Sequence, residues 1–248
     1  MRVSFFEEFP TKQNLAKLKY VTWPTTMYVA AKNIKEFKKI KNSITNTQVE
    51  VGYWPILEHK EGYWLSPFSS SKAMKRVMKE VDGKKIKVMW DAELPLRHPW
   101  LFLRVDNFIT NLPRIRKFFK KNGKNILSAE YPIKNSFAGS FLKMMGVSYS
   151  PKKYGNKKIV MYYTSMHKLI PTFLLSGITK LHKKYGDGLQ VGLGVTDVGI
   201  LGNEPIIKAK NLKRDLQEMK KIGVKEVVIF RLGGMNEKYA SVIKKYVL

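Results

Sequence analysis

The sequence alternates eight times between a segment typical of a β-strand and a segment typical of an α-helix, with no Gly/Ser-rich linker between the units. Most strand segments are apolar runs rather than strict alternations, as expected for strands that helices cover on the outside. This pattern predicts an α/β fold, a single (β/α)8 (TIM) barrel. An open, doubly wound sheet is the alternative, but it would need fewer strands or a second domain. The expected strands are 3–8, 27–31, 48–54, 86–91, 125–130, 158–164, 189–195 and 226–232, and the expected helices are 12–19, 34–41, 70–81, 112–121, 137–145, 168–184, 212–222 and 237–246.

Composition limits the class of protein. With 44% hydrophobic and 26% charged residues, the chain can bury one large core, so we expect residues 1–248 to form one domain. The absence of cysteine excludes disulfides, thiolate catalysis and Cys-ligated zinc. The longest apolar stretch, around residues 169–178, is too short to span a bilayer, which predicts a cytoplasmic protein without a transmembrane segment.

The chain is strongly basic. It has 46 Lys and Arg against 19 Asp and Glu, a net charge of +27. Of the basic residues, 38 are Lys and 8 are Arg, whereas base reading and bidentate phosphate recognition favour the planar fork of Arg. We therefore expect sequence-independent, salt-sensitive attraction to polyanions or acidic lipid headgroups. A non-catalytic barrel that binds nucleic acid or an anionic membrane remains an alternative function. The oligomeric state is not predicted.

Carboxylates gather at the predicted strand ends. A Glu-x-Pro tripeptide ends three strands, at Glu8, Glu93 and Glu130, and Asp91 precedes Glu93 by two residues. In a barrel these ends converge on one mouth, where active sites lie. Carboxylates crowded at a desolvated mouth raise each other's pKa, which suits a proton donor or a cation site. A proton donor at this position predicts cleavage of a glycosidic bond, a reaction in which the donor is paired with a nucleophile or base.

Aromatic residues accompany these acids. The tripeptide Gly52-Tyr53-Trp54 recurs as Gly62-Tyr63-Trp64 in a long segment, residues 55–68, after the third strand, and Trp90 lies at the end of the fourth. Long loops of this kind are frequently functional. Flat aromatic faces beside carboxylates suit the apolar faces of sugar rings. We therefore expect Tyr53, Trp54, Trp64 and Trp90 to bind substrate, although rim packing would explain each tryptophan taken alone.

The layout resembles that of the (β/α)8 glycoside hydrolases, with acids after the fourth and seventh strands, aromatic walls and the tripeptide Asn203-Glu204-Pro205. In the large retaining clan of these enzymes, Asn-Glu-Pro follows the fourth strand and carries the acid/base Glu, while the nucleophilic Glu follows the seventh. Here the tripeptide follows the seventh strand, and the fourth ends in Asp91-Ala92-Glu93. The resemblance implies a hydrolase of a small-molecule or oligosaccharide substrate. Its expected catalytic residues are Glu93 with Glu204 or Glu130, oriented and tuned by Glu8 and Asp91.

A second enzyme class has its own support. Glycines after the seventh strand and the Gly233-Gly234 pair before the last helix are typical of loops whose N–H groups bind phosphate. Lys32 and Arg231, at the ends of two strands, could add positive charge. The alternative is thus a Mg2+-dependent phosphoryl or sugar-phosphate enzyme with Glu8, Asp91, Glu93 and Glu130 as oxygen ligands. The leading interpretation needs no cofactor.

Two histidines complete the candidates. His98 and His167 follow the fourth and sixth strands and could serve as a general base or a ligand, and we include His167 among the substrate-binding residues. No Ser-His-Asp order with a nucleophile elbow, no Walker loop and no zinc-binding helix motif occurs. These enzyme classes are therefore not expected.

Overall fold

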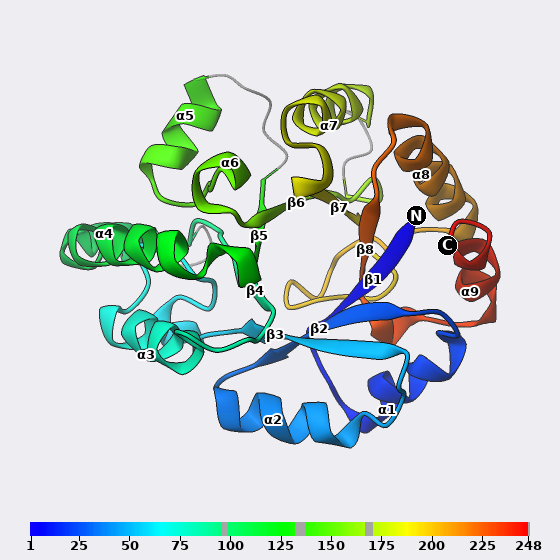
Figure 1. The fold of residues 1–248 in the computed structure, drawn as a ribbon, viewed down its shortest axis with the longest axis horizontal. Helices are drawn as coiled ribbons and strands as arrows, with labels where there is room; N and C mark the ends of the chain where they lie inside the picture. Colours follow the sequence, from blue (N-terminus) through cyan, green and yellow to red (C-terminus); the bar gives the residue numbers. More distant parts are fainter. Residues whose placement is uncertain (96–98, 132–136, 167–170, 248) are drawn as a thin grey trace.

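The computed structural model describes residues 1–95, 99–131, 137–166 and 171–247. Eight parallel strands form a closed barrel in sequence order, and β1 pairs with β8 to close it (Figure 1). This confirms the predicted (β/α)8 barrel. The strands are β1 (Arg2–Glu7), β2 (Thr25–Ala31), β3 (Val49–Pro55), β4 (Val88–Asp91), β5 (Ile126–Glu130), β6 (Lys157–Tyr162), β7 (Leu189–Gly194) and β8 (Glu226–Phe230).

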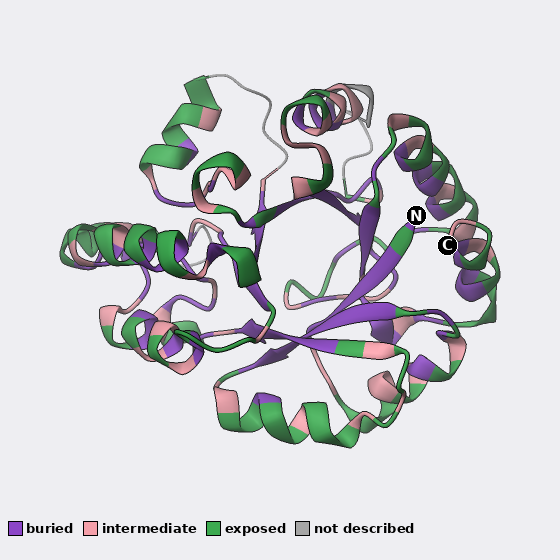
Figure 2. Cartoon of the chain, in the orientation of Figure 1, coloured by how far each residue is buried: buried purple, intermediate pink, exposed green. Residues whose placement is uncertain are grey.

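Helices surround the barrel (Figure 1). They are α1 (Lys12–Leu15), α2 (Ile34–Ser43), α3 (Ser71–Val81), α4 (Val105–Asn122), α5 (Phe137–Met144), α6 (Pro151–Tyr154), α7 (Pro171–Tyr185), α8 (Ala209–Ile222) and α9 (Glu237–Lys244), with short 3-10 turns between several elements. Buried positions fall on the strands and on the helix faces that cover them, whereas the outer helix faces are exposed (Figure 2). Of the described helices, none is long and apolar enough to cross a membrane. The cytoplasmic location remains a prediction.

Helix α4 differs most from the sequence-based expectation. It begins at Val105 rather than near Leu112 and continues through Pro113. Asn111, which directly precedes the expected helix 112–121, is buried inside α4 and donates hydrogen bonds to the carbonyls of Pro67 and Ser69. A proline inside a helix removes a backbone hydrogen bond, so Pro113 disfavours a helix that extends on both sides of it. The tertiary contacts of Asn111 stabilise the N-terminal half of α4 despite this proline.

The core has two parts, because successive strand residues point to opposite faces. Inside the barrel, Phe6, Trp54, Met89, Ala129 and Val228 belong to one cluster. Between strands and helices, a larger cluster holds Tyr53, Trp90 and many aliphatic residues. Which of the two faces a strand residue occupies decides whether its side chain can reach the mouth of the barrel.

Candidate active site

A cavity of about 350 Å3 opens at the C-terminal ends of the strands, the end at which (β/α)8 enzymes carry their active sites. Its wall is largely aromatic and aliphatic, and four carboxylates project into it. The described residues that line it are Phe6, Glu8, Trp54, Trp64, Met89, Asp91, Glu93, Leu94, Ala129, Tyr131, Met161, Tyr163, Met166, Val195, Ile200, Leu201, Glu204 and Phe230.

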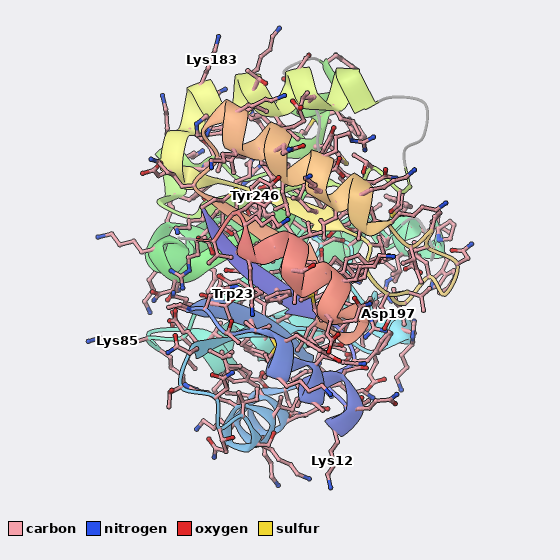
Figure 3. The ribbon with its side chains drawn as sticks, turned by 90° about the vertical axis from the view of Figure 1, so that its right-hand side faces the viewer. Lys12, Trp23, Lys85, Lys183, Asp197 and Tyr246 are labelled. Atoms are coloured by element: carbon pink, nitrogen blue, oxygen red, sulfur yellow. The ribbon has the colours of Figure 1, made fainter. Side chains whose placement is uncertain are left out.

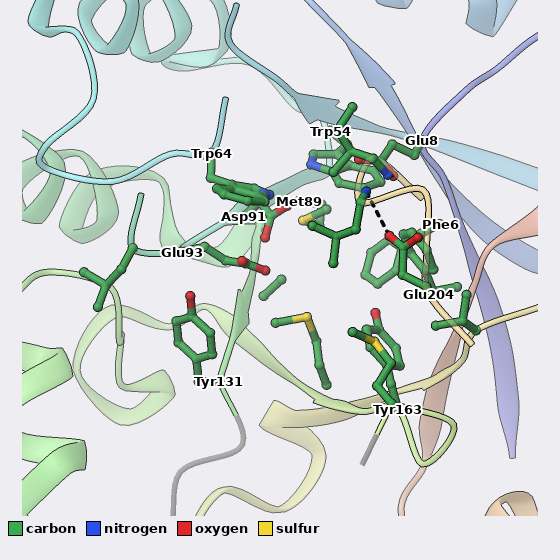
Figure 4. Close-up of a pocket in the computed structure, with 18 residues that line it drawn as sticks. Phe6, Glu8, Trp54, Trp64, Met89, Asp91, Glu93, Tyr131, Tyr163 and Glu204 are labelled. Atoms are coloured by element: carbon green, nitrogen blue, oxygen red, sulfur yellow. Dashed lines mark hydrogen bonds between the residues drawn. The ribbon is translucent and has the colours of Figure 1, made fainter. Parts of the chain in front are cut away.

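The four carboxylates form two pairs on different sides of the cavity (Figure 4). Asp91 is the last residue of β4, and Glu93 lies two residues beyond it, beside Trp64 and Tyr131. Glu8 follows β1, and Glu204 comes from the long connection between β7 and α8. Since strand residues alternate in direction, Asp91 and Glu93, two residues apart, both face inward. The expected convergence of acids from distant units is thus found for these four residues.

Asp91 and Glu93 both have a raised pKa. Burial raises the pKa of Glu93 to about 7, and the charge of Glu8 adds to this, while a hydrogen bond from Tyr131 acts in the opposite direction. Burial raises the pKa of Asp91 well above its usual range, with further contributions from Glu93 and Glu8. The indole N–H of Trp54 points toward Asp91 without reaching good hydrogen-bond geometry, and has no other partner among the described residues. Burial and the neighbouring negative charge thus favour the protonated form of both carboxyl groups.

Glu8 and Glu204 are held by backbone and side-chain donors. Glu8 accepts hydrogen bonds from the Tyr63 hydroxyl at 2.7 Å and from the Ile200 N–H at 2.9 Å. Burial raises the pKa of Glu8, and these two bonds partly offset that effect. Glu204 Oε1 accepts from the Leu201 N–H at 3.0 Å, whereas its buried Oε2 has no partner among the described residues. One carboxylate oxygen is therefore free to bind a substrate donor.

Gly199 allows these two carboxylates to approach the loop between β7 and α8. A Cβ atom at this position would lie 2.7 Å from Glu8 Oε2 and 3.0 Å from Glu204 Oε1. Both oxygens thus lie within a few ångströms of one backbone point, and a side chain there would displace them. The glycine read from the sequence as part of a phosphate loop is explained by this close approach.

Glu130 does not line the cavity, so the expectation that it shares the mouth with the other acids is wrong. It follows Ala129 on β5, and Ala129 pairs in register with inward-facing Asp91, so Glu130 faces the helix layer. There it forms a buried ion pair of 2.6 Å with Lys158 and accepts hydrogen bonds from the Ser128 hydroxyl and the Tyr149 N–H. The Glu-x-Pro tripeptide at Glu130 is shifted by one residue relative to those at Glu8 and Glu93, which reverses the direction of its glutamate side chain.

Trp90 and Tyr53 also face outward, and the structure corrects their expected role in substrate binding. Trp90 packs on Phe118 and Phe119 of α4, and Tyr53 stacks on Phe37 of α2 at 4.9 Å between ring centroids. Both are fully buried in the layer between strands and helices. Trp54 and Trp64, by contrast, lie in the cavity wall (Figure 4).

Most of the residues expected to bind phosphate instead hold loops of the barrel in place. Arg231 is buried and binds Glu7 at 3.0 Å, Asp197 at 2.7 Å and the Val198 carbonyl at 2.8 Å. The Gly233 N–H donates to Glu7 at 2.7 Å, and a Cβ at Gly234 would lie 2.0 Å from the Thr196 carbonyl oxygen. Lys32, the other expected cation, is exposed and pairs with Glu58 at 3.0 Å, outside the cavity wall. His98 and His167 lie outside the described residues.

The arrangement does not suit the alternative Mg2+ site. Glu130, one of its four expected ligands, is committed to Lys158 outside the barrel. Among the described residues, no three carboxylate or imidazole groups lie close enough together to hold a metal ion. The remaining acids Glu8, Asp91 and Glu93 share a cavity but not a coordination sphere.

Sequence reasoning missed two tyrosines of the cavity wall, Tyr131 and Tyr163. Each lies two residues beyond an inward-facing strand residue, Ala129 on β5 and Met161 on β6. Extending the two-residue alternation past the strand ends would have found both. The segment Ile200 and Leu201, which supplies backbone donors to the acids, carried no such signal because it lies in an irregular loop.

Comparison with solved structures finds the same fold in several proteins. The glycoside hydrolase domain of PgaB (BpsB) from Bordetella bronchiseptica is 9% identical, with a TM-score of 0.58 over 99% of this chain and 98% of that one. The GH18 chitinase ChiB of Flavobacterium johnsoniae is 10% identical, with a TM-score of 0.62 over 99% and 93%. A D-tagatose 3-epimerase-like protein is 12% identical, with a TM-score of 0.59 over 99% and 97%.

These similarities show the barrel fold, which this chain shares with carbohydrate hydrolases and with an epimerase-like protein. No family model matches the sequence, and no curated protein sequence matches it significantly.

Proposed function

We propose that this protein hydrolyses glycosidic bonds, with Glu93 as the general acid. The observation that carries the proposal is the pair of buried carboxyl groups, Asp91 and Glu93, in the wall of an aromatic cavity, where burial raises the pKa of both, that of Glu93 to about 7. A carboxylic acid with a raised pKa beside further carboxylates is the arrangement that glycoside hydrolysis requires. The hydrolase neighbours in fold support the same reaction class.

In this mechanism Glu93 transfers its proton to the glycosidic oxygen as the bond from that oxygen to the anomeric carbon breaks. The bonding electrons leave with the oxygen, and positive charge develops on the sugar ring. Glu8 supplies negative charge close to it, which stabilises the transition state. A water molecule then adds to the anomeric carbon and gives its proton to a carboxylate of the cavity.

The wall supplies binding as well as chemistry. Trp54, Trp64, Tyr131 and Tyr163 present aromatic surface to a sugar ring. The indole N–H of Trp54 and Oε2 of Glu204, both buried, can bind substrate hydroxyl groups. These polar atoms would fix the orientation of a ring held by apolar contacts.

The charged groups of the cavity wall favour substrates of particular charge. Four carboxylates line it, and of the described lining residues none is Lys, Arg or His. Such a wall repels phosphate and carboxylate groups and favours neutral or amine-bearing sugars. The sugar-phosphate alternative raised by the sequence is for this reason less well supported than hydrolysis of an uncharged or cationic saccharide.

The test is a screen of neutral, N-acetylated and de-N-acetylated oligosaccharides, with release of new reducing ends as the readout. We expect turnover of at least one of them by the wild-type protein and its loss in Glu93→Gln. If turnover persists undiminished in a normally folded Glu93→Gln variant, the proposed role of Glu93 is wrong. Failure of the wild-type protein to cleave any saccharide of the panel would count against the hydrolase function.

A further inference from the structure

The large apolar side chains of the described residues that are exposed to solvent come from one part of the chain, between β4 and α8. They follow the C-terminal ends of β4, β5, β6 and β7, either before the next helix or within it. We call this set the apolar rim. It consists of Trp100, Leu103, Val105, Ile109, Phe137, Phe141, Met144, Met166, Leu201 and Ile206. Scattered exposed apolar residues are ordinary, but their confinement to four successive units beside the cavity mouth is not.

Helix α5 shows the property most clearly. Leu142 is its one buried residue, and the helix is largely exposed in Figure 2. Phe137 is 90% exposed, and in the preceding unit Leu103 is 81% exposed. Exposure of these side chains costs the folded protein the hydrophobic stabilisation that burial would provide, which points to a partner that covers them.

The part of the apolar rim that follows β4 packs against a segment next to the cavity wall. Phe68, in the segment that follows the cavity residue Trp64, packs on Phe102 and Phe108 with centroids 5.0 and 4.9 Å apart. Asn107, in the first turn of α4, accepts a hydrogen bond from the Ser71 hydroxyl at 2.9 Å. The apolar side chains of this sector therefore sit on a rigid support next to the mouth.

The charge around this sector is positive. Residues 99–117 and 137–144, which carry the apolar side chains after β4 and β5, contain five Lys and Arg against one acid. That acid, Asp106, pairs with Arg104 at 3.0 Å. Exposed Arg114, Arg116 and Lys143 lie on the same two helices as the apolar side chains. These three form no ion pair with another described residue, and apolar residues interspersed with such basic ones are typical of surfaces that insert into an anionic lipid interface.

We propose that the apolar rim docks onto an anionic lipid bilayer, so that the mouth of the cavity faces the headgroup layer. A second copy of this chain is a poorer occupant, because two molecules of charge +27 repel each other and an interface at the rim would obstruct the cavity. The preference for Lys over Arg also fits diffuse attraction to headgroups better than bidentate recognition of a structured partner.

The experiment is co-sedimentation of the full chain with phosphatidylcholine vesicles, with and without about 30% phosphatidylglycerol. We expect binding to the anionic vesicles, weakened by about 0.5 M salt, and little binding to the neutral ones. The double variant Leu103→Gln with Phe137→Gln keeps the net charge and alters two exposed positions. It should bind anionic vesicles at least about tenfold more weakly, because the leucine and phenylalanine side chains no longer insert into the apolar part of the bilayer.

The control removes charge instead of apolar surface. Lys85 precedes β4, and Figure 3 shows it at the end of the molecule away from Asp197, which follows β7 on the mouth side. Lys85→Gln should bind nearly as the wild-type protein does. Equal binding of the double variant and the wild-type protein would show adsorption by charge alone and overturn the proposal. Equal binding to neutral vesicles, or dimerisation that the double variant abolishes in the absence of lipid, would overturn it as well.

Discussion

The hydroxyl group of Tyr63 donates a hydrogen bond of 2.7 Å to Glu8, a buried carboxylate that the chain places 55 residues earlier. Tyr63 lies in the segment between β3 and α3 and stacks on His59, with ring centroids 5.1 Å apart. This contact joins the first and third units of the barrel at the mouth. It favours the ionised form of Glu8 at a place where burial opposes ionisation.

Removal of that donor should make Glu8 harder to ionise. In Tyr63→Phe the pKa of Glu8 is expected to rise further above its usual value, since burial would act with one fewer hydrogen bond to offset it. Carboxyl-carbon NMR titration measures this directly. Tyr20→Phe, at a tyrosine in the turn after α1, serves as the control and should leave the titration of Glu8 unchanged.

Glu93→Gln should lower kcat by about a hundredfold or more, because the amide cannot donate a proton to the leaving oxygen. Glu237→Gln removes an exposed carboxylate at the start of α9 and is the matched control, with normal turnover expected. In the wild-type protein, activity should decline as pH rises through about 7, where Glu93 loses its proton. A rate that stays constant from pH 6 to pH 9 would contradict the assignment of Glu93 as the acid.

The raised pKa of Glu93 also has a consequence for stability. Between about pH 4.5 and pH 7 the folded state holds a proton on Glu93 that the unfolded state has lost, so this group's contribution to the free energy of unfolding falls as pH rises. Glu93→Gln has no such dependence. The Tm of the variant, relative to the wild-type Tm, should therefore increase from pH 5 to pH 8 in thermal melts, and a constant difference would argue against burial of an ionisable Glu93.

Glu130 and Lys158 should matter for folding rather than catalysis. Both side chains are almost completely buried and form an ion pair of 2.6 Å. Glu130→Gln would leave the ammonium group of Lys158 without its counter-charge and should lower the free energy of unfolding by about 3–5 kcal/mol. Urea denaturation measures the loss. Activity per folded molecule should be retained, and the double variant Glu130→Leu with Lys158→Met should recover much of the stability.

The charge of the cavity predicts the order in which charged and neutral oligosaccharides bind. Amine-bearing and neutral oligosaccharides should bind more tightly than oligosaccharides of the same length that carry carboxylate or phosphate groups. Isothermal titration calorimetry with Glu93→Gln separates binding from turnover. Glu204→Gln, which removes one of the four carboxylates, should reduce the preference for the amine-bearing ligand. Tighter binding of the phosphorylated ligand would contradict this reading of the site.

The sequence alone determined the architecture and part of the site. Eight alternations of apolar strand and amphipathic helix are compatible with few folds, because each strand must be covered and each helix must bury one face. Asp91 and Glu93 were identified for the same kind of local reason, since residues two apart at the end of a strand share a face. Trp54, Trp64, Glu8 and Glu204, also candidates from the sequence, line the cavity as well.

Only the tertiary structure decided which side of the barrel wall the other candidates face. Glu130 and Trp90 lie one position from inward-facing residues, and a shift of one residue sends a side chain into the helix layer. The partners of Arg231 were equally hidden, because Glu7 and Asp197 are brought to it by closure of β1 onto β8 and by an irregular loop. A linear pattern fixes the direction of side chains within one strand, whereas the register between strands and the path of loops arise from the packing of the whole chain.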